Sequence, residues 1–448
     1  DPATGQVTFT PTDKSYTGKV TPVKVQAESS NGIKVDTTYT PEIVPVTPTA
    51  TPAETTDIQG ATQTGKPVFT EGDSRVPMND QVPATFEDGT TTKTIPGEGT
   101  YTVAPDGTVT FVPEKSFTGT GTGVTVKRVD KNGTPVTATY TPTVTPVTPT
   151  AEPTTSTGKQ GQTQTGKPEF TEGDSRVPMN DDVPATFDDG STTKTVDGVG
   201  TYTVAADGTV TFVPEKSFVG TAPAVTVVRE DMNGTKASAT YTPTVTPVTP
   251  TATPAVSTDI QGATQTGKPV FTEGDSRVPM NDDVPATFDD GSTTKTVEGV
   301  GTYTVAVDGT VTFVPEKSFV GEAPAVTVVR EDVNGTKASA TYTPTVTPVT
   351  PTGEPATSTD IQGQTQSGKP TFIEGDPNVP IDEDTPATFE DGSTTKTVDG
   401  EGTYTVSPDG TVTFVPEKSF TGTASGVTVK RVDKNGTEIT AKYTPTVT

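Results

Sequence analysis

Apolar and polar residues alternate one by one over several short stretches of the chain. Residues 99–104 (GTYTVA) and 108–113 (TVTFVP) both alternate, and Asp106-Gly107 separates them. Alternation with a period of two places every second side chain on one face of a β-strand, and Asp-Gly is a turn that joins antiparallel strands. The pattern therefore predicts a β-hairpin across residues 99–113.

A second pair of alternating stretches surrounds an Asn-Gly dipeptide. Residues 123–130 (GVTVKRVD) precede it and residues 135–144 (PVTATYTPTV) follow it. Asn-Gly in this setting is the strongest short-range signal of a hairpin. The dipeptide recurs along the chain, so we expect structural hairpin turns at Asn132, Gly133, Asn233, Gly234, Asn334, Gly335, Asn435 and Gly436.

Weaker strand signals lie at residues 67–70, 83–86 and 91–95. Together these stretches make about seven strands in some 80 residues, which is typical of an all-β, antiparallel, immunoglobulin-like β-sandwich. The apolar faces of the strands predict the core residues: Phe69, Phe86, Tyr101, Val103, Val109, Phe111, Phe117, Val124, Val126 and Tyr140.

The whole pattern recurs every 101 residues, as Gly-Lys-Pro does at Gly65, Gly166, Gly267 and Gly368. This period exceeds the ~20–50 residues of a solenoid repeat and fits a domain with its own core. Residues 1–44 match only the second half of a copy, so we expect the chain to be a piece of a longer protein. The predicted organisation is a tandem array: a half repeat at 1–44, repeat domains at 65–144, 166–245, 267–346 and 368–448, and linkers at 45–64, 145–165, 246–266 and 347–367.

The segments between the predicted domains are rich in Pro and Thr. Proline supplies no donor to a β-ladder and favours the extended polyproline II conformation. We therefore expect semi-rigid spacers of about 3.1 Å per residue. The tail of each segment, such as residues 58–63 (IQGATQ), could equally be the first strand of the next domain. Disorder is a further alternative, but regular alternation in four copies argues against it for the domains.

Composition and charge exclude several classes of function. The chain has 31 basic and 57 acidic side chains, a net charge of −26, and no Cys, His, Trp or Leu. Without Cys or His there is no disulfide, thiolate zinc site, imidazole ligand or Ser-His-Asp triad. The acidic balance argues against nucleic acid as a partner. No apolar stretch approaches 18 residues, so we expect no membrane insertion.

Clusters of acidic and amide side chains are the candidates for chemistry. Calcium takes six to eight oxygen ligands, and the candidate residues are Glu71, Asp73, Asn79, Asp80, Glu87 and Asp88. Solvated loops and Asx turns explain the same residues without a metal, so we expect no cofactor and keep calcium as the alternative. Carboxylate pairs also serve glycoside hydrolysis, but no pair is marked out by the sequence, and we expect no enzyme.

An intramolecular isopeptide bond is another hypothesis, because it would lock strands without Cys. Lysines recur in every full copy at the positions of Lys66, Lys93 and Lys115. Candidate acceptors are Asn79 and Asn180, whose position in the last copy is occupied by Asp382. Turn and strand-edge lysines are the simpler interpretation.

The combined motifs resemble those of a known family. GTYTVxxDGTVTFVPEKSFxG, then VTVxRxDxNGT and ATYTPTVTPVTP, are similar to the CshA-type fibril repeats of streptococcal surface adhesins, over nearly the whole chain. The resemblance implies a long, extracellular, cell-wall-anchored adhesin of a Gram-positive coccus. In such proteins the repeats form the fibril stalk, and a separate N-terminal region engages host proteins such as fibronectin.

These observations favour a structural function. The first hypothesis is a stalk of tandem β-sandwiches that projects an adhesive tip from the cell wall for host or interbacterial adhesion. Its partners would be neighbouring repeats in the same chain, with host extracellular-matrix proteins bound by regions outside this piece. The alternative is that the repeats themselves bind a matrix protein or partner bacteria multivalently. A minor alternative is association of exposed sheet edges between fibrils.

Overall fold

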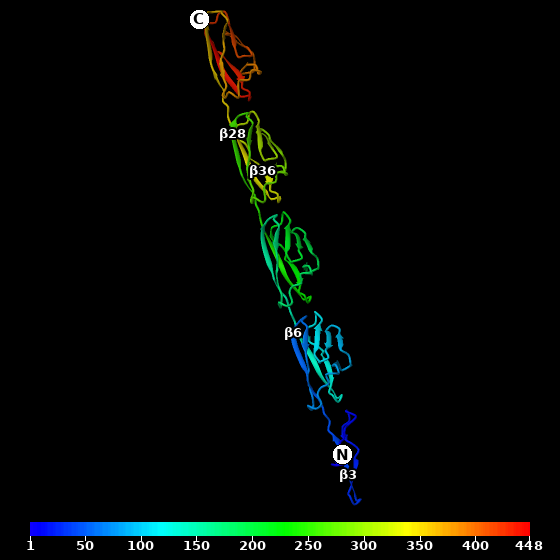
Figure 1. The fold of residues 1–448 in the computed structure, drawn as a ribbon. Coiled ribbons are helices and arrows are strands. Elements are labelled where there is room, and N and C mark those ends of the chain that lie inside the picture. The colour runs from blue at the N-terminus through cyan, green and yellow to red at the C-terminus, as the bar shows by residue number, and fades with distance from the viewer. The chain divides into compact units, whose positions relative to one another are not determined.

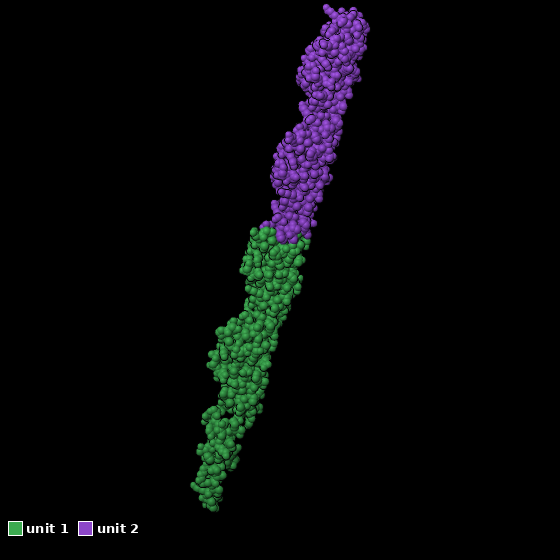
Figure 2. All heavy atoms as spheres, turned by 180° about the vertical axis from the view of Figure 1, so that it is seen from behind, with its two compact units in different colours: residues 1–158, 162–214, 221–245 green, residues 159–161, 215–220, 246–448 purple.

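The computed structural model describes residues 1–448, which form strands and connecting segments without any helix. The chain divides into two compact units, coloured separately in Figure 2. The first comprises residues 1–158, 162–214 and 221–245, and the second comprises residues 159–161, 215–220 and 246–448. The first unit holds residues 1–44, the first full repeat and most of the second, and the second unit holds the third and fourth repeats and two short pieces of the second.

Each full repeat contains two main sheets and a small two-stranded sheet (Figure 1). The first repeat contains β5 (Thr49–Thr51), β6 (Ala53–Ile58), β7 (Gln63–Gly65), β8 (Val68–Thr70), β9 (Thr85–Phe86), β10 (Thr92–Ile95), β11 (Gly99–Val103), β12 (Val109–Pro113), β13 (Gly119–Thr120), β14 (Val124–Val129) and β15 (Pro135–Thr145). One sheet has the order β10-β11-β12-β7, and the other has β15 at its centre.

The long strand β15 organises the second sheet. Its first half pairs antiparallel with β14, and its second half pairs with β13. On its other side, β6 runs parallel to it, from Ala53 opposite Tyr140 to Ile58 opposite Thr145. β14 also pairs with β9, and β5 forms a small ribbon with β8. The first and last long strands of a repeat are therefore parallel neighbours.

Aromatic side chains form the core between the two sheets. Tyr101, Phe111 and Tyr140 are fully buried. The ring of Tyr101 stacks on Phe111 at 4.5 Å and meets Tyr140 edge-on at 6.4 Å. Phe69 and Phe117 are partly buried against this cluster. In β11 and β12 the inward side chains are buried and the intervening residues are more exposed, as the alternation predicts. The predicted tandem array of antiparallel β-sandwiches is confirmed.

The same strands recur in the other repeats. The second has β16 (Thr150–Glu152), β17 (Thr154–Lys159), β18 (Gln164–Gly166), β19 (Glu169–Thr171), β20 (Thr186–Phe187), β21 (Thr193–Val196), β22 (Gly200–Val204), β23 (Val210–Pro214), β24 (Gly220–Thr221), β25 (Val225–Glu230) and β26 (Lys236–Thr246). The third has β27 (Thr251–Thr253), β28 (Ala255–Ile260), β29 (Gln265–Gly267), β30 (Val270–Thr272), β31 (Thr287–Phe288), β32 (Thr294–Val297), β33 (Gly301–Val305), β34 (Val311–Pro315), β35 (Gly321–Glu322), β36 (Val326–Glu331) and β37 (Lys337–Thr347). The fourth has β38 (Thr352–Glu354), β39 (Ala356–Asp360), β40 (Gln366–Gly368), β41 (Thr371–Ile373), β42 (Thr388–Phe389), β43 (Thr395–Val398), β44 (Gly402–Val406), β45 (Val412–Pro416), β46 (Gly422–Thr423), β47 (Val427–Val432) and β48 (Glu438–Val447).

The segments expected to be linkers contain strands. Residues 45–64 hold β5, β6 and the start of β7, and β6 completes the sheet of the repeat that follows. The sequence signal was weak because the inward positions of β6 are Ala53 and Thr55 rather than large apolar residues. Pro52 lies between β5 and β6, where a strand begins and no ladder donor is needed. The boundaries of independently folding domains stay a prediction, which limited proteolysis would test.

Residues 1–44 have strands but no core. A hairpin joins β2 (Val23–Glu28) to β3 (Lys34–Tyr39), and β1 (Gly18–Lys19) pairs with β4 (Glu42–Ile43). No residue of this segment is buried. We expect its amides to exchange with solvent near the unprotected rate.

Candidate functional site

The predicted Asn-Gly turns lie at the tip of the hairpin between β14 and β15 and at the same place in the other repeats. The carboxylate of Asp130 is fully buried and accepts hydrogen bonds from the backbone N–H of Asn132 at 2.9 Å and of Thr134 at 2.8 Å. Gly133 has φ +83°, while no residue other than glycine has positive φ. The same contacts recur around Asp231, Asp332 and Asp433. A buried carboxylate therefore fixes the backbone on which each turn asparagine sits.

Three of the acidic residues considered for calcium have separate partners. Asp73 binds Arg75 through a two-point contact, and Asp88 accepts from Thr90. These bonds hold the pKa of Asp73 and that of Asp88 below the usual value, with the side-chain donors as the main cause. Asp80 binds Arg128 at 2.7 Å. The structure brings together no group of three or more acidic side chains suited to hold a metal ion.

Arg128, on β14, contacts both Asp80 in a loop and Phe69 on β8. Its side chain is about nine-tenths buried, and its guanidinium lies 6.0 Å from the centre of the Phe69 ring. A cation over an aromatic ring contributes about 0.5–1 kcal/mol at exposed sites and more when desolvated. Arg229 and Arg330 make the same contacts in their repeats. We interpret this set as structural.

The first of the recurring lysines pairs with an aspartate that is not among the proposed isopeptide acceptors. Lys66 forms an ion pair with Asp106 at 2.8 Å, and the pair recurs as Lys167–Asp207, Lys268–Asp308 and Lys369–Asp409. The backbone N–H of Thr411, then Lys369, lowers the pKa of Asp409 to about 2. Both side chains of each pair are half exposed, so each pair contributes at most about 1 kcal/mol.

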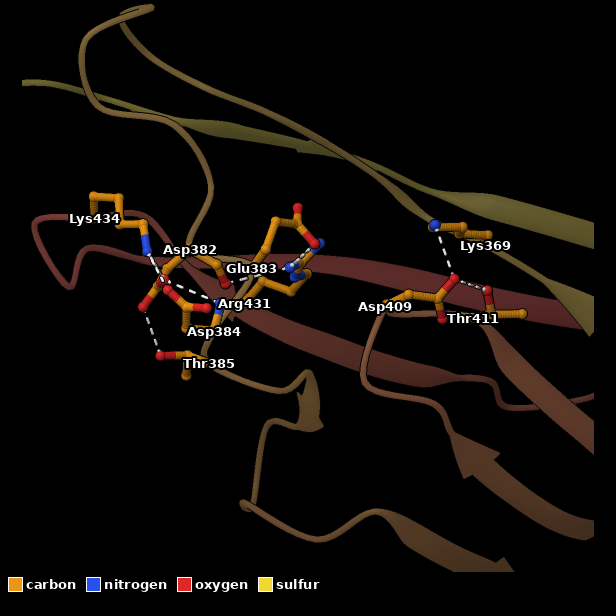
Figure 3. A network of polar contacts seen from close by, with 9 residues as sticks. All are labelled: Lys369, Asp382, Glu383, Asp384, Thr385, Asp409, Thr411, Arg431 and Lys434. Carbon is orange, nitrogen blue, oxygen red and sulfur yellow. Dashed lines mark hydrogen bonds and ion pairs between the residues drawn. The ribbon is translucent and has the colours of Figure 1, made fainter.

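A polar network distinguishes the fourth repeat (Figure 3). Lys434 binds Asp382 at 2.5 Å and Asp384 at 2.8 Å, and Thr385 donates to Asp382 at 2.7 Å. These donors, Lys434 first, lower the pKa of Asp382 to about 2. Arg431 binds Glu383 at 3.1 Å in the same loop. The lysine that reaches Asp382 is therefore Lys434, on the hairpin, and not one of the three recurring lysines.

A set of buried glutamines was not predicted from the sequence. In the first repeat, the side-chain amide of Gln63 donates to Thr143 O at 2.9 Å, while its carbonyl accepts from Thr55 at 2.6 Å. Thr55 also bonds to the hydroxyl of Tyr140 at 2.7 Å. Gln63 thereby connects the two sheets, since β7 and β15 belong to different ones. A Cβ on Gly65 would lie 2.4 Å from the Tyr140 ring, which explains the Gly of Gly-Lys-Pro.

Gln59 is the second such residue, and it lies just after β6. It is buried, and its side-chain amide donates to Lys115 O at 2.7 Å. Its backbone N–H donates to Thr145 O at 2.8 Å. Gln-Gly recurs at 59–60, 160–161, 261–262 and 362–363 as regularly as the strand motifs. This regularity, inside segments expected to be linkers, was the signal that could have identified it.

Comparison with solved structures finds weak similarity to several extracellular chains. Drosophila N-cadherin EC1-4 is 13% identical, with 89% of this chain and 99% of that chain covered and a TM-score of 0.22. Human desmocollin-1 ectodomain is 13% identical, with 95% and 85% covered and a TM-score of 0.23. Mouse cadherin-23 EC22-24 is 14% identical, with 68% and 100% covered and a TM-score of 0.28.

The family comparison is specific. No curated protein matches the chain, and the structure contains no helix that could cross a membrane. The profile of the surface adhesin CshA repetitive domain matches five successive stretches: residues 1–43, 45–144, 146–245, 247–346 and 348–447. The resemblance seen in the sequence motifs is confirmed, and the chain belongs to the family of CshA repetitive domains of surface adhesins.

Proposed function

We propose that this chain is a length of the stalk of a bacterial surface fibril. The stalk would be anchored to the wall of a Gram-positive cell and would project an adhesive tip for host or interbacterial adhesion. Such a role needs no catalytic group, no metal and no cofactor. Five tandem matches to an adhesin repeat support the proposal, together with a separate core in the repeats whose core clusters are described.

The observation that carries the proposal is the parallel pairing of β6 with β15. Tension along the chain pulls β6 toward its N-terminal end and β15 toward its C-terminal end. Because the strands are parallel neighbours over six residue pairs, these pulls act in opposite directions along the ladder and load its hydrogen bonds together. The same pairing occurs between β28 and β37 and between β39 and β48. A stalk under tension requires this kind of resistance.

Single-molecule force spectroscopy on the whole chain tests the proposal. We expect four unfolding steps of about 300 Å each, since ~100 residues extend by ~3.3–3.6 Å per residue. Residues 1–44 should lengthen without a step and are an internal control. Extension without steps would contradict a load-bearing stalk.

A matched pair of variants tests the shear geometry itself. Thr55→Pro removes a backbone donor from β6, and we expect one of the four steps to move to lower force. Thr55→Val removes the same hydroxyl but keeps the N–H, and it should change that force less. Equal effects would overturn the role of the ladder. Binding of the intact chain to immobilised matrix protein would favour the alternative of multivalent binding repeats.

A further inference from the structure

The Asn-Gly hairpin of one repeat contacts the Gln-Gly turn of the repeat before it. Within the first unit, the side-chain amide of Asn233 donates to the backbone oxygen of Gln59 at 2.9 Å. Within the second unit, Asn435 donates to Gln261 O at 2.7 Å. Gln160 and Asn334, which both belong to the second unit, make the same bond at 3.0 Å. The contact is therefore a repeated feature of the chain.

The glycine of the turn is needed for this approach. Gly60 has φ +83°, and a Cβ built on it would lie 2.3 Å from the side-chain oxygen of Asn233. Gly262 has the same φ, and its Cβ would lie 2.2 Å from the side-chain oxygen of Asn435. At Gly363 of the last repeat, where no hairpin follows in this chain, a Cβ would meet nothing within 4 Å. The close approach thus belongs to the docked hairpin and not to the turn itself.

The short segment at Val147 and Thr148 contacts both the preceding and the following repeat. Val147 is buried, and its N–H donates to the side-chain oxygen of Gln59 at 3.2 Å. On the other side, a Cβ on Gly173 of the following repeat would lie 2.5 Å from Thr148 O. In the second unit, the N–H of Val349 donates to the side-chain oxygen of Gln261 at 3.3 Å. A Cβ built on Gly375 would lie 2.5 Å from the backbone carbonyl carbon of Thr350. The connection is therefore packed against both repeats, whereas its Pro content predicts a semi-rigid spacer between them.

The donor asparagine is held in place by its own repeat. The fully buried carboxylate of Asp231 accepts from the N–H groups of Asn233 and Thr235, both at 2.9 Å. The hairpin therefore keeps its shape independently of the preceding repeat. A preorganised donor and a preorganised acceptor lose little conformational entropy when they meet.

We propose that the Gln-Gly turn of a repeat is a docking site for the Asn-Gly hairpin of the next repeat, so that side-chain contacts within each compact unit fix the orientation of the hairpin against the turn. The partner that the site fits is another repeat of this family. The hairpin amide supplies the donor, the turn carbonyl the acceptor, and the absent side chain of glycine the space. This inference holds for the chain whether or not it forms a stalk.

Double electron–electron resonance (DEER), which measures the distance between two spin labels, tests the proposal on the full chain. Since the protein has no Cys, Val112→Cys and Val213→Cys introduce two unique, half-exposed label positions on successive repeats of the first unit. We expect a narrow distance distribution. Asn233→Ala should broaden it, with a roughly tenfold larger undocked population, because one hydrogen bond at a partly buried contact is lost.

The matched control is Asn132→Ala. Asn132 occupies the same turn in the first full repeat, and residues 1–44 contain no Gln-Gly turn for it to bind. Its distribution should equal that of the labelled parent. Asn233→Asp preserves the shape of the side chain and replaces the donor by an acceptor, so it should broaden the distribution even if the Ala variant disturbs the hairpin. A broad distribution in the parent, or an unchanged one in both Asn233 variants, would overturn the proposal.

Discussion

The same turn has different surroundings in the first and last full repeats. In the first, Gln59 is buried and Ile58 is partly buried. In the last, Gln362 is exposed and Ile361 has 62% of its surface accessible. The two turns have nearly the same sequence, IQGAT and IQGQT. The difference in burial therefore comes from the neighbouring repeat and not from the turn.

The bonds within the repeat are the same at both turns. Gln59 donates to Lys115 O at 2.7 Å, and Gln362 donates to Lys418 O at 3.0 Å. The backbone N–H of Gln362 also donates to Thr448 O at 3.0 Å, as that of Gln59 does to Thr145 O. Each repeat thus builds its docking site alone, and the next repeat only covers it. Such preorganisation lowers the entropic cost of docking.

The largest difference in stability between the two turns should come from replacing the glutamine of each, Gln59 or Gln362, by alanine. Gln59→Ala leaves the buried Val147 N–H and the Lys115 carbonyl without partners, which costs about 1–3 kcal/mol. Gln362→Ala should cost about 0.5 kcal/mol or less, because water replaces the exposed amide. Hydrogen exchange read by mass spectrometry at residues 53–64 and 356–367 measures both. Equal losses at the two turns would show that the neighbour adds nothing.

The comparison also explains what the sequence could predict. Alternation around Tyr101, Phe111 and Tyr140 identified the central strands and their core, because large apolar side chains recur there with a period of two. It missed β6, whose contribution is a backbone ladder with small inward residues. It also missed the partnership of Gln59 with Asn233, which lies 174 residues away. Local patterns report strands, whereas a contact between repeats depends on how two of them pack.

A second difference between the two turns should follow from replacing their glycines, Gly60 and Gly363, by alanine, which adds a Cβ atom. Gly60→Ala and Gly363→Ala both strain a backbone with φ near +80°, at about 1–2 kcal/mol each. Only Gly60→Ala also collides with Asn233 and undocks the hairpin. We expect subtilisin to cleave residues 145–150 of the Gly60 variant about fivefold faster, from the loss of roughly 1 kcal/mol of docking.

Residues 246–251 have the same sequence, TPVTPT, and serve as an internal reference in that digestion. Their cleavage rate should not change in either variant, and the Gly363 variant should match the parent at both segments. Faster cleavage of residues 145–150 in the Gly363 variant would point to a general loss of stability instead of undocking.

A third test converts the open turn into a covered one. Appending a second copy of residues 348–448 after Thr448 reproduces the junction found at residues 347–348. Amide exchange at residues 361–363 should then slow by about fivefold, toward the rate at residues 260–262. The same addition with Ala at the asparagine equivalent to Asn435 should leave exchange fast. An unchanged rate in the first fusion would mean that the last turn is not a docking site.

The smallest expected effect is a difference in acid sensitivity between two covered turns, the one at Gln59 and the one at Gln261. Arg176 binds Asp57 at 3.0 Å across the first contact, whereas the last repeat has Asn378 at the position of Arg176. Lys115 lies beside this contact, and Asp174 also binds Arg176, at 3.4 Å. The N–H of Ile58 first, and Arg176 after it, lower the pKa of Asp57 below its ordinary value of 3.8. The carboxylate therefore stabilises the contact above pH 3.8, and this contribution is lost as the pH falls through the lowered pKa.

Because both side chains are substantially exposed, we expect acid to broaden the Val112–Val213 label distance only slightly, with the undocked population changing about twofold. Arg176→Gln should show that population already at pH 6 and respond less to acid. Screening by 1 M salt should act in the same direction as the substitution. A response to acid that is equal in parent and variant would place the titrating group elsewhere and leave the hydrogen bond of Asn233 as the main determinant of docking.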